Sequence, residues 1–405
     1  MARRRPLEGV RIADFTWAWA GPWCTTVLGD MGAEIIKIES NVRPDVHRLL
    51  RTYADQVPGL NRAGLFNNIN RNKLSATINL SGPEGQQLAR DLVRCCDVVA
   101  ENFSPRVMAT LGLDYPRLRE VRPDLVMVSL SGYGQTGPYR LYPAYGDSMW
   151  AFTGAALLTG CEDGPPEMPG IPISDPIVGI HGAFAVLAAL HDRERTGQGQ
   201  YIDVTQLECI MATMPEPVAE YGLNQRQPRR WGNRHPTFAP HGCYPCAGAD
   251  SWLTIAVTSH DEWSALCRAM GMPRLARDPR FATMPSRWDH QDELDETIAA
   301  WTRLHPARNL FLKLQRAGVP AAPTFKVPEL LEDPHLNARG FWVNDRHPEV
   351  GERIIQGVTW KMSATPGGVE RPAPCQGEHN DYVFGELMGL SSPERQRLEA
   401  SGVIR

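Results

Sequence analysis

The chain has 405 residues, of which 42% are apolar and 22% are charged, and its formal net charge is −4. This length suggests two or three domains, and the balanced charge gives no indication of binding to nucleic acid or to a membrane surface. No segment approaches the roughly 20 apolar residues of a membrane span, and the basic Met1–Pro6 is not followed by the apolar core of a secretory signal. Nine scattered cysteines favour a cytoplasmic protein with free thiols.

The first 200 residues alternate between short apolar segments and amphipathic ones. The expected strands are Val10–Phe15, Ala33–Glu39, Val98–Glu101 and Leu125–Ser131, and the expected helices are Gly21–Gly32, Pro83–Arg94 and Ser104–Leu111. This βαβ order predicts an α/β domain with a doubly wound, Rossmann-like parallel sheet. Ligands bind such sheets at the carboxyl ends of the strands, where Thr16–Pro22, Ser40, Asn102 and Gly132–Gly137 follow the expected strands.

Two nucleotide-binding signatures are missing from the chain. The loop after the first strand reads TWAWAGP rather than GxGxxG, and no GxxxxGK[ST] occurs, which argues against an NAD enzyme or a P-loop hydrolase. The single CxxC pair, Cys243 and Cys246, lies in an expected Pro/Gly-rich loop. One such pair is a weak zinc or redox signal, so we expect structural thiols and no metal.

The second half of the chain predicts a smaller α+β domain. We expect a large domain over 1–223, a small domain over 224–330, and a C-terminal segment over 331–405 that returns to the large domain. The first boundary falls at the arginine-rich Asn224–Pro236. The expected later elements are a strand at Trp252–Val257, helices at Glu262–Met270, Glu293–His305 and Ala307–Ala317, and short strands at Gly340–Arg346 and Arg353–Gly357.

One aspartate, Asp175, stands directly before Pro176 and a long apolar run. We expect Asp175 to be the N-cap of a helix that becomes charged at His191–Arg195 and ends at Thr196-Gly197. Free backbone N–H groups and the helix dipole at that end would favour the ionised carboxylate that a nucleophile requires. Judged only on its local sequence, an Asp-Pro of this kind is more often a simple helix cap.

Short motifs are spread over nearly the whole chain. They are Leu7–Glu39, Asn70–Ser75 (NRNKLS), Glu101–Pro105 (ENFSP), Leu111–Tyr115 (LGLDY), Ser131–Tyr139 (SGYGQTGPY), Gly170–Gln200, Gly318–Pro323 (GVPAAP), Glu332–Gly340 and Gly377–His379. Their order and spacing resemble the family III CoA-transferases, the group that contains formyl-CoA transferase and the carnitine and bile-acid CoA-transferases. In this resemblance Asp175 stands at the position of the catalytic aspartate.

The resemblance implies transfer of CoA from an acyl-CoA donor to a carboxylic acid. Asp175 would attack the donor thioester to give a mixed anhydride, which the CoA thiolate would convert to an aspartyl-CoA thioester. Backbone N–H groups are expected to stabilise the tetrahedral intermediates. CoA and acyl-CoA are substrates, and no permanently bound cofactor is expected. The implied architecture is a homodimer of two interlocked, ring-shaped chains.

The resemblance also implies an acyl pocket. Trp17, Trp19 and Ala20 lie in the loop expected over the reacting group, and Trp19 replaces a polar residue of the relatives, which indicates a bulky or aromatic acyl substrate. Packing of these tryptophans and Trp23 against the second chain is an equally open interpretation.

Tyr145 and Asp147 are further expected pocket residues. Many relatives carry an acid directly after this tyrosine, where this chain has Gly146 and places Asp147 one residue later.

Six residues are expected to bind CoA, and they are Arg43, Asn72, Lys73, Asn102, Phe103 and Arg106. Lys73 would meet a phosphate as a point charge, and Phe103 would stack near the adenine. Arg106 stands where relatives often carry glycine and would supply additional phosphate charge.

Two alternatives stay open at this point. α-Methylacyl-CoA racemase has the same fold but carries histidine where this chain has Gly146, and His181 is expected to be a packed or surface residue. A non-catalytic CoA-binding protein would be expected to lack the nucleophile, which this chain retains as Asp175.

Overall fold

The computed structural model describes residues 5–404, so most of the basic Met1–Pro6 segment lies outside it. The chain forms two compact units. The larger unit comprises the residues up to Ala155, Met168–Gly222 and Pro334 onward, and the smaller comprises Ala156–Glu167 and Leu223–Asp333. The prediction placed 156–167 in the large domain, whereas these residues pack with the small unit, where Arg230 donates hydrogen bonds to the carbonyl oxygens of Leu157 and Cys161.

The larger unit is built on a six-stranded parallel sheet with the strand order β3-β2-β1-β4-β5-β6. Its strands are β1 (Arg11–Asp14), β2 (Glu34–Glu39), β3 (Lys73–Thr77), β4 (Val98–Glu101), β5 (Val126–Ser131) and β6 (Tyr201–Thr205). The order reverses between β1 and β4, which is the arrangement of a doubly wound fold. The expected α/β class and parallel sheet are therefore confirmed.

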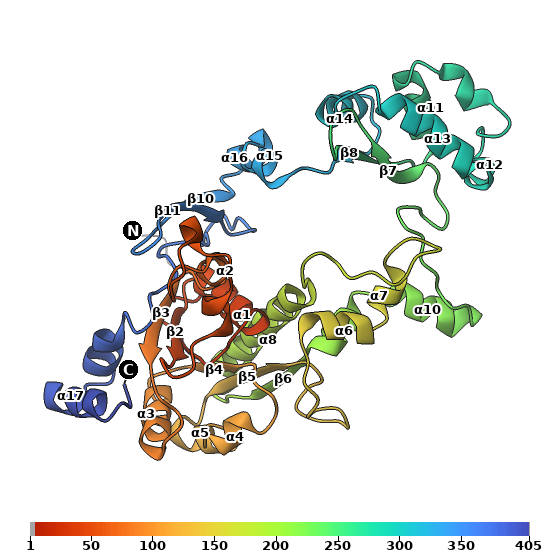
Figure 1. The fold of residues 1–405 in the computed structure, drawn as a ribbon. Helices are drawn as coiled ribbons and strands as arrows, with labels where there is room; N and C mark the ends of the chain where they lie inside the picture. The colour runs from red at the N-terminus through yellow and green to blue at the C-terminus, as the bar shows by residue number, and fades with distance from the viewer. Residues whose placement is uncertain (1–4, 405) are drawn as a thin grey trace. The chain divides into compact units, whose positions relative to one another are not determined.

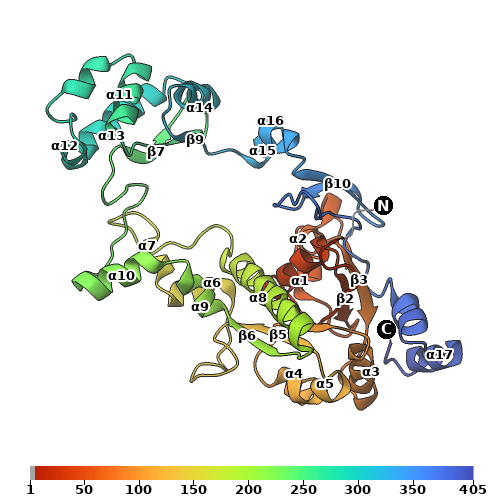
Figure 2. The same cartoon turned by 180° about the vertical axis from the view of Figure 1, so that it is seen from behind.

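Both faces of this sheet are buried, because successive strand residues point to opposite sides. Ile12 and Ile35 pack against one group of helices, while Ala13 and Ile36 pack against another. Figures 1 and 2 show α1 (Ala20–Asp30) and α8 (Ser174–Thr196) on the first face, and α3 (Pro83–Val93) and α5 (Tyr115–Val121) on the second. Near-continuous apolar strands such as Val126–Ser131 follow from this double burial.

Helix α8 ends where the sequence predicted, at Gly197, whose φ of 68° lies in the left-handed region that favours glycine. By length and composition α8 could span a membrane, and 44% of its most apolar stretch is buried inside the protein. Gly179 and Gly182 allow it to approach its neighbours closely. A Cβ atom on Gly179 would lie 2.8 Å from the carbonyl oxygen of Ala20, and one on Gly182 would lie 2.6 Å from Leu130.

Strand β3 was not predicted as a strand, because its sequence KLSAT is largely polar. All five of its residues are nevertheless buried. Its outer edge is covered by the C-terminal segment, where His379 accepts a hydrogen bond from the Ser75 N–H and Asn380 accepts one from the Thr77 N–H. The helix expected over Ser104–Leu111 is also shorter, and α4 spans only Val107–Thr110.

The smaller unit contains a three-stranded antiparallel sheet of β7 (His241–Pro245), β8 (Trp252–Ala256) and β9 (Ala321–Pro323). The expected helices are present as α11 (His260–Ala269), α13 (Gln291–Thr302) and α14 (Ala307–Arg316), and Trp263 lies in the core that they form with the sheet. Cys243 therefore lies on a strand, not in the predicted loop, because the CxxC segment pairs with β8. In the larger unit, β10 (Trp342–His347) and β11 (Gly351–Gln356) form an antiparallel pair, and α17 (Ser392–Ala400) ends the chain.

Candidate active site

Asp175 lies in the first turn of α8, not at the N-cap position that the sequence predicted. The helix begins at Ser174, and Ile173 precedes it without a side-chain cap. The Asp175 N–H donates to the carbonyl oxygen of Pro172, 3.2 Å away. The side chain is therefore free of the capping role and is directed toward neighbouring elements.

The Asp175 carboxylate accepts a hydrogen bond from a residue that sequence reasoning missed. Gln206 is the first residue of α9 (Gln206–Ala212), which follows β6, and its Nε2 lies 3.1 Å from Oδ1 of Asp175. The two residues are 31 positions apart, so no local pattern signals this contact. In the described part of the chain, the expected backbone N–H donors do not contact this carboxylate.

Burial raises the pKa of Asp175 to about 6, although the hydrogen bond from Gln206 lowers it and the charge of Asp147 raises it further. The expectation that the helix start would favour the ionised form is therefore not met, because burial removes the carboxylate from water and raises its pKa. The group is still largely ionised at neutral pH. A carboxylate with a raised pKa is also a stronger base and a more reactive nucleophile than an exposed one.

The other oxygen of Asp175 lies close to Gly146, where an added side chain would force it to shift. A Cβ atom on Gly146, the first residue of α6 (Gly146–Phe152), would lie 2.6 Å from Asp175 Oδ2 and 2.6 Å from Ser174 Oγ. The Ser174 side chain is buried and its hydroxyl has no hydrogen-bond partner among the described residues. Tyr145, by contrast, is 79% exposed, and Asp147 is also exposed.

The loop that follows β1 is held by a buried charge network. Asp14 accepts a hydrogen bond from the Thr16 N–H at 2.9 Å, and Lys37 donates to the Thr16 carbonyl oxygen at 2.7 Å. Lys37 is paired with Asp45 at 2.9 Å, and Asp45 in turn accepts a hydrogen bond from the Ala18 N–H. Ala18 has a φ of 62°, a conformation that non-glycine residues rarely adopt, so these contacts impose the shape of the loop.

Lys73, expected to meet a CoA phosphate, belongs to this buried network instead. It is fully buried, and its ammonium group lies 3.0 Å from Asp14 Oδ2, 2.7 Å from Thr25 Oγ1 and 3.0 Å from Asn70 Oδ1. In this structure Lys73 therefore has no exposed surface, and its ammonium group is bonded within the fold. Its position, next to Asp14, indicates that it supports the loop after β1.

The side chain of Asn72 likewise forms its hydrogen bonds within the fold. Its side-chain amide donates to Asp30 and to the carbonyl oxygen of Gly368, and its side-chain oxygen accepts from the Glu370 N–H. These bonds join the start of β3 to the C-terminal segment and leave no group of this side chain directed at a ligand.

Three of the expected residues gather around a cavity of about 430 Å³ at the carboxyl ends of β1, β2 and β4. Trp17 and Phe103 meet edge to face with ring centroids 5.6 Å apart, and the Arg43 guanidinium lies 5.3 Å from the Trp17 ring centre. Asn102 holds Trp17 in place, accepting from its N–H at 2.7 Å and donating to its carbonyl oxygen at 2.8 Å. The cavity is also lined by Phe15, Ile38, Glu39, Ser40, Val42, Ile78, Asn79, Leu80, Ser81, Ser104, Val107 and Leu111.

The remaining expected residues lie elsewhere in the larger unit. Trp19 precedes α1 and packs toward His47 with ring centroids 6.5 Å apart, while Ala20 begins α1 beside Gly179, one helical turn after Asp175. Trp23 packs on Gly179 within the same chain.

Arg106 has a φ of 82°, which gives a physical reason for glycine at this position in relatives. It lines a separate cavity of about 320 Å³ together with Glu101, whose pKa burial raises to about 7.

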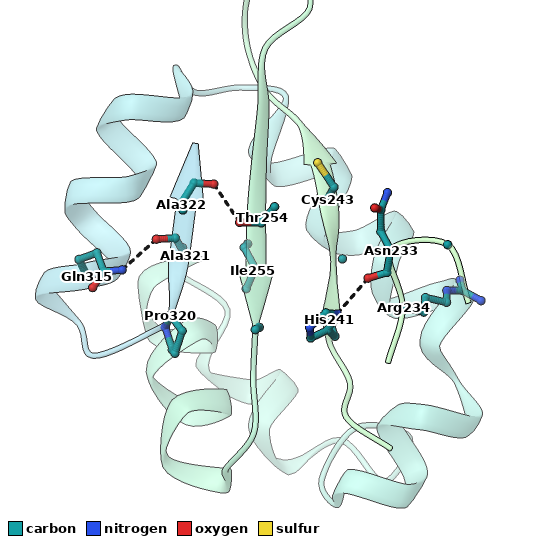
Figure 3. Close-up of a pocket in the computed structure, with 13 residues that line it drawn as sticks. Asn233, Arg234, His241, Cys243, Thr254, Ile255, Gln315, Pro320, Ala321 and Ala322 are labelled. Atoms are coloured by element: carbon teal, nitrogen blue, oxygen red, sulfur yellow. Dashed lines mark hydrogen bonds between the residues drawn. The ribbon is translucent and has the colours of Figure 1, made fainter. Parts of the chain in front are cut away.

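A further cavity of about 550 Å³ lies in the smaller unit (Figure 3). Two of its polar side chains are bonded within the fold, since Gln315 donates to the Ala321 carbonyl oxygen and Thr254 donates to that of Ala322. Cys243 lines it, and burial raises the pKa of this thiol, which makes it a poor nucleophile.

Comparison with known proteins gives one consistent result. The profile of CoA-transferase family III matches residues 7–380. The chain is 40% identical to the succinyl-CoA–D-citramalate CoA-transferase of Chloroflexus aurantiacus, covering 99% of this chain and 98% of that enzyme. It is 36% identical to the succinate–glutarate CoA-transferase of Agrobacterium fabrum (95% and 96%) and 32% identical to the formyl-CoA:oxalate CoA-transferase of Streptomyces coelicolor (99% and 99%).

Among solved structures, a CAIB/BAIF family protein from Brucella suis superposes with a TM-score of 0.87 at 31% identity, covering 95% of this chain and 100% of that one. The family profile and the relatives extend over nearly the whole chain, and the fold matches throughout. The chain is therefore an enzyme of the acyl-CoA:carboxylate type and belongs to CoA-transferase family III.

Proposed function

We propose that this enzyme transfers CoA between dicarboxylic acids through covalent intermediates on Asp175. One observation carries the proposal. A largely buried carboxylate at the start of α8 has one oxygen held by Gln206 and the other beside Gly146, which has no side chain to cover it. This asymmetry leaves Oδ2 as the oxygen that attacks.

The proposed steps of CoA transfer require no reactive groups other than those of the enzyme and its two substrates. Asp175 Oδ2 attacks the thioester carbonyl carbon, a C–O bond forms, the C–S bond breaks, and the CoA thiolate leaves with the electron pair. The thiolate then attacks Cγ of Asp175, and the first acid departs with Oδ2. The acceptor carboxylate attacks the resulting aspartyl-CoA thioester, and the released thiolate attacks the acceptor carbonyl to give the new acyl-CoA and free Asp175.

The cavity beside Trp17 supports binding of the CoA nucleotide. Its apolar wall includes Phe103, on which an adenine would stack, and Arg43 provides a positive charge at the rim for a phosphate. It lies at the carboxyl ends of the strands, where α/β sheets of this kind bind ligands.

The names of the relatives support a dicarboxylic acid as the acceptor. D-Citramalate, glutarate and oxalate share two carboxylates, and two of these enzymes are named for succinyl-CoA or succinate. The bulky or aromatic substrate expected from Trp17 and Trp19 is the competing proposal. It is weakened by the contacts of Trp17 with Phe103 and of Trp19 with His47.

Racemisation is disfavoured because this chain has Gly146 where the racemase carries histidine, so this position holds no side chain that could move a proton. His181 is exposed, and its Nδ1 lies 2.8 Å from the carbonyl oxygen of Ile177 in its own helix. We therefore expect no rapid α-deuteration of a 2-methylacyl-CoA in deuterated water.

We also propose that the enzyme is a homodimer and that it is located in the cytoplasm. Ile180 and Phe184 are 55% and 72% exposed one turn apart on α8, an apolar strip that supports association with a second copy as a homodimer. All nine cysteines are free, which supports a reducing compartment such as the cytoplasm. Sedimentation analysis of the purified protein tests the dimer.

Mass spectrometry after incubation with a panel of acyl-CoAs tests the proposed chemistry. We expect succinyl-CoA to give a modified peptide containing Asp175 that hydroxylamine converts to a hydroxamate, and we expect Asp175→Ala to give none. Preferential labelling by an aromatic acyl-CoA would instead favour the aromatic proposal. The absence of a label with every donor would refute the aspartyl mechanism.

A further inference from the structure

Gln206 occupies a rigid position beside the nucleophile. It is 6% exposed and begins α9 directly after β6, at the carboxyl edge of the sheet. The preceding Thr205 caps this helix by accepting a hydrogen bond from the Glu208 N–H, which fixes the first turn. The amide of Gln206 is therefore held by both a strand and a capped helix, and its Nε2 lies 3.1 Å from Asp175 Oδ1.

We propose that Gln206 is a catalytic residue whose side-chain N–H stabilises the negative charge that develops on Oδ1 of Asp175 during CoA transfer. This inference rests on the aspartyl mechanism proposed above. It assigns to a side-chain amide the role that the sequence had led us to expect of backbone N–H groups.

The charge appears on Oδ1 because Oδ2 is bonded to the acyl group in the mixed anhydride. When the CoA thiolate attacks Cγ, the electron pair of the Cγ–Oδ1 double bond moves onto Oδ1. The pair returns when the Cγ–Oδ2 bond breaks and the acid leaves. Attack of the acceptor carboxylate on the aspartyl-CoA thioester places charge on the same atom, so one donor beside Oδ1 serves both steps.

The surroundings of Asp175 suit an amide at this position. Asp147 is the charged residue that acts on Asp175 from α6, and it disfavours additional negative charge. An amide N–H donates at every pH, whereas a carboxylate at residue 206 would repel both the nucleophile and the oxyanion. Among the described residues no hydrogen bond is formed by the buried Ser174 hydroxyl, and both it and Asp175 Oδ2 lie beside Gly146.

The mechanism predicts which Asp175 intermediate accumulates when the Gln206 N–H is removed and succinyl-CoA is supplied without an acceptor acid. Anhydride formation by Oδ2 places no new charge on Oδ1, but attack of the thiolate on Cγ does. Gln206→Met keeps most of the side-chain volume and removes the N–H. We expect kcat to fall by roughly 10²–10³-fold, the range found for loss of one oxyanion donor. In rapidly quenched samples, the Asp175 adduct should shift from the CoA thioester toward the acyl anhydride.

Gln87→Met is the matched control. Gln87 donates to Asp91 at the same distance of 3.1 Å, but Gln87 is exposed on α3 and Asp91 is only partly buried. This variant should retain wild-type kcat and the wild-type ratio of the two adducts. Thermal unfolding of both variants shows whether they are folded.

The outcomes separate the inference from the proposed function. With succinyl-CoA and no acceptor acid, a folded Gln206→Met enzyme that shows the wild-type adduct ratio would overturn the inference, whether or not its overall rate falls, because a purely structural contact slows anhydride formation and thiolate attack on Cγ alike. If the wild-type enzyme itself forms no Asp175 adduct, the aspartyl mechanism fails and the inference fails with it.

Discussion

Replacement of Gly146 by alanine tests the geometry around Asp175 with the smallest possible change. The added Cβ would lie 2.6 Å from Asp175 Oδ2, so the carboxylate has to move by roughly 0.4–0.8 Å to restore a separation of 3.0–3.4 Å. A displacement of about 1 Å at a reacting group costs on the order of 10²-fold in rate. Overpacking of this kind also destabilises a protein by about 1–3 kcal/mol. We expect a folded enzyme whose kcat for CoA transfer is roughly 10²-fold lower.

Steady-state transfer from succinyl-CoA to glutarate, together with thermal unfolding, measures both effects. Gly170→Ala is the control, because nothing lies within 4 Å of a Cβ at this exposed position. It should leave both the rate and the stability unchanged. Full activity of Gly146→Ala at unchanged stability would show that Asp175 is not held against Gly146 during catalysis, and the assignment of Oδ2 as the attacking atom would be refuted.

Because the protonated carboxyl of Asp175 is inactive and burial raises its pKa to about 6, kcat/KM should fall about tenfold per pH unit below that value. Asp147→Asn should move this acid limb to lower pH, since the charge of Asp147 raises the pKa of Asp175, and an unmoved limb would contradict the coupling. Lys73→Met should destabilise the protein by about 3–5 kcal/mol in urea unfolding, because Asp14 would lose a buried partner; unchanged stability would contradict this reading of the network. Arg43→Ala should raise KM for acyl-CoA severalfold with little change in kcat, and an unaltered KM would remove Arg43 from the CoA site.

Much of the fold could be predicted because its signals are local. The apolar segments Val98–Glu101 and Leu125–Ser131 became β4 and β5 with boundaries shifted by at most one residue. Glycine at 197 ended α8 as expected, since only a left-handed residue completes that cap. The order of the family's motifs likewise led to Asp175.

The errors arose where polar residues are buried by distant partners. The segment of Lys73 was not predicted as a strand, and Lys73 was expected to meet a CoA phosphate, because nothing near it in the chain neutralises its charge. Asp14, 59 residues earlier, does so in the folded protein. Asn72 was misjudged for the same reason, since its partner Gly368 lies 296 residues away.

The sequence by itself determined the parallel sheet, the long helix α8 and the aspartate at its start, because hydrophobic alternation, helix-ending glycine and family motifs are written in neighbouring residues. Only the tertiary structure decided the state of that aspartate. Burial sets its pKa, Gln206 selects which oxygen is held, and Gly146 leaves space for the other. These properties depend on three elements that meet only after folding, and electrostatic and steric effects at such a site act through distances in space rather than along the chain.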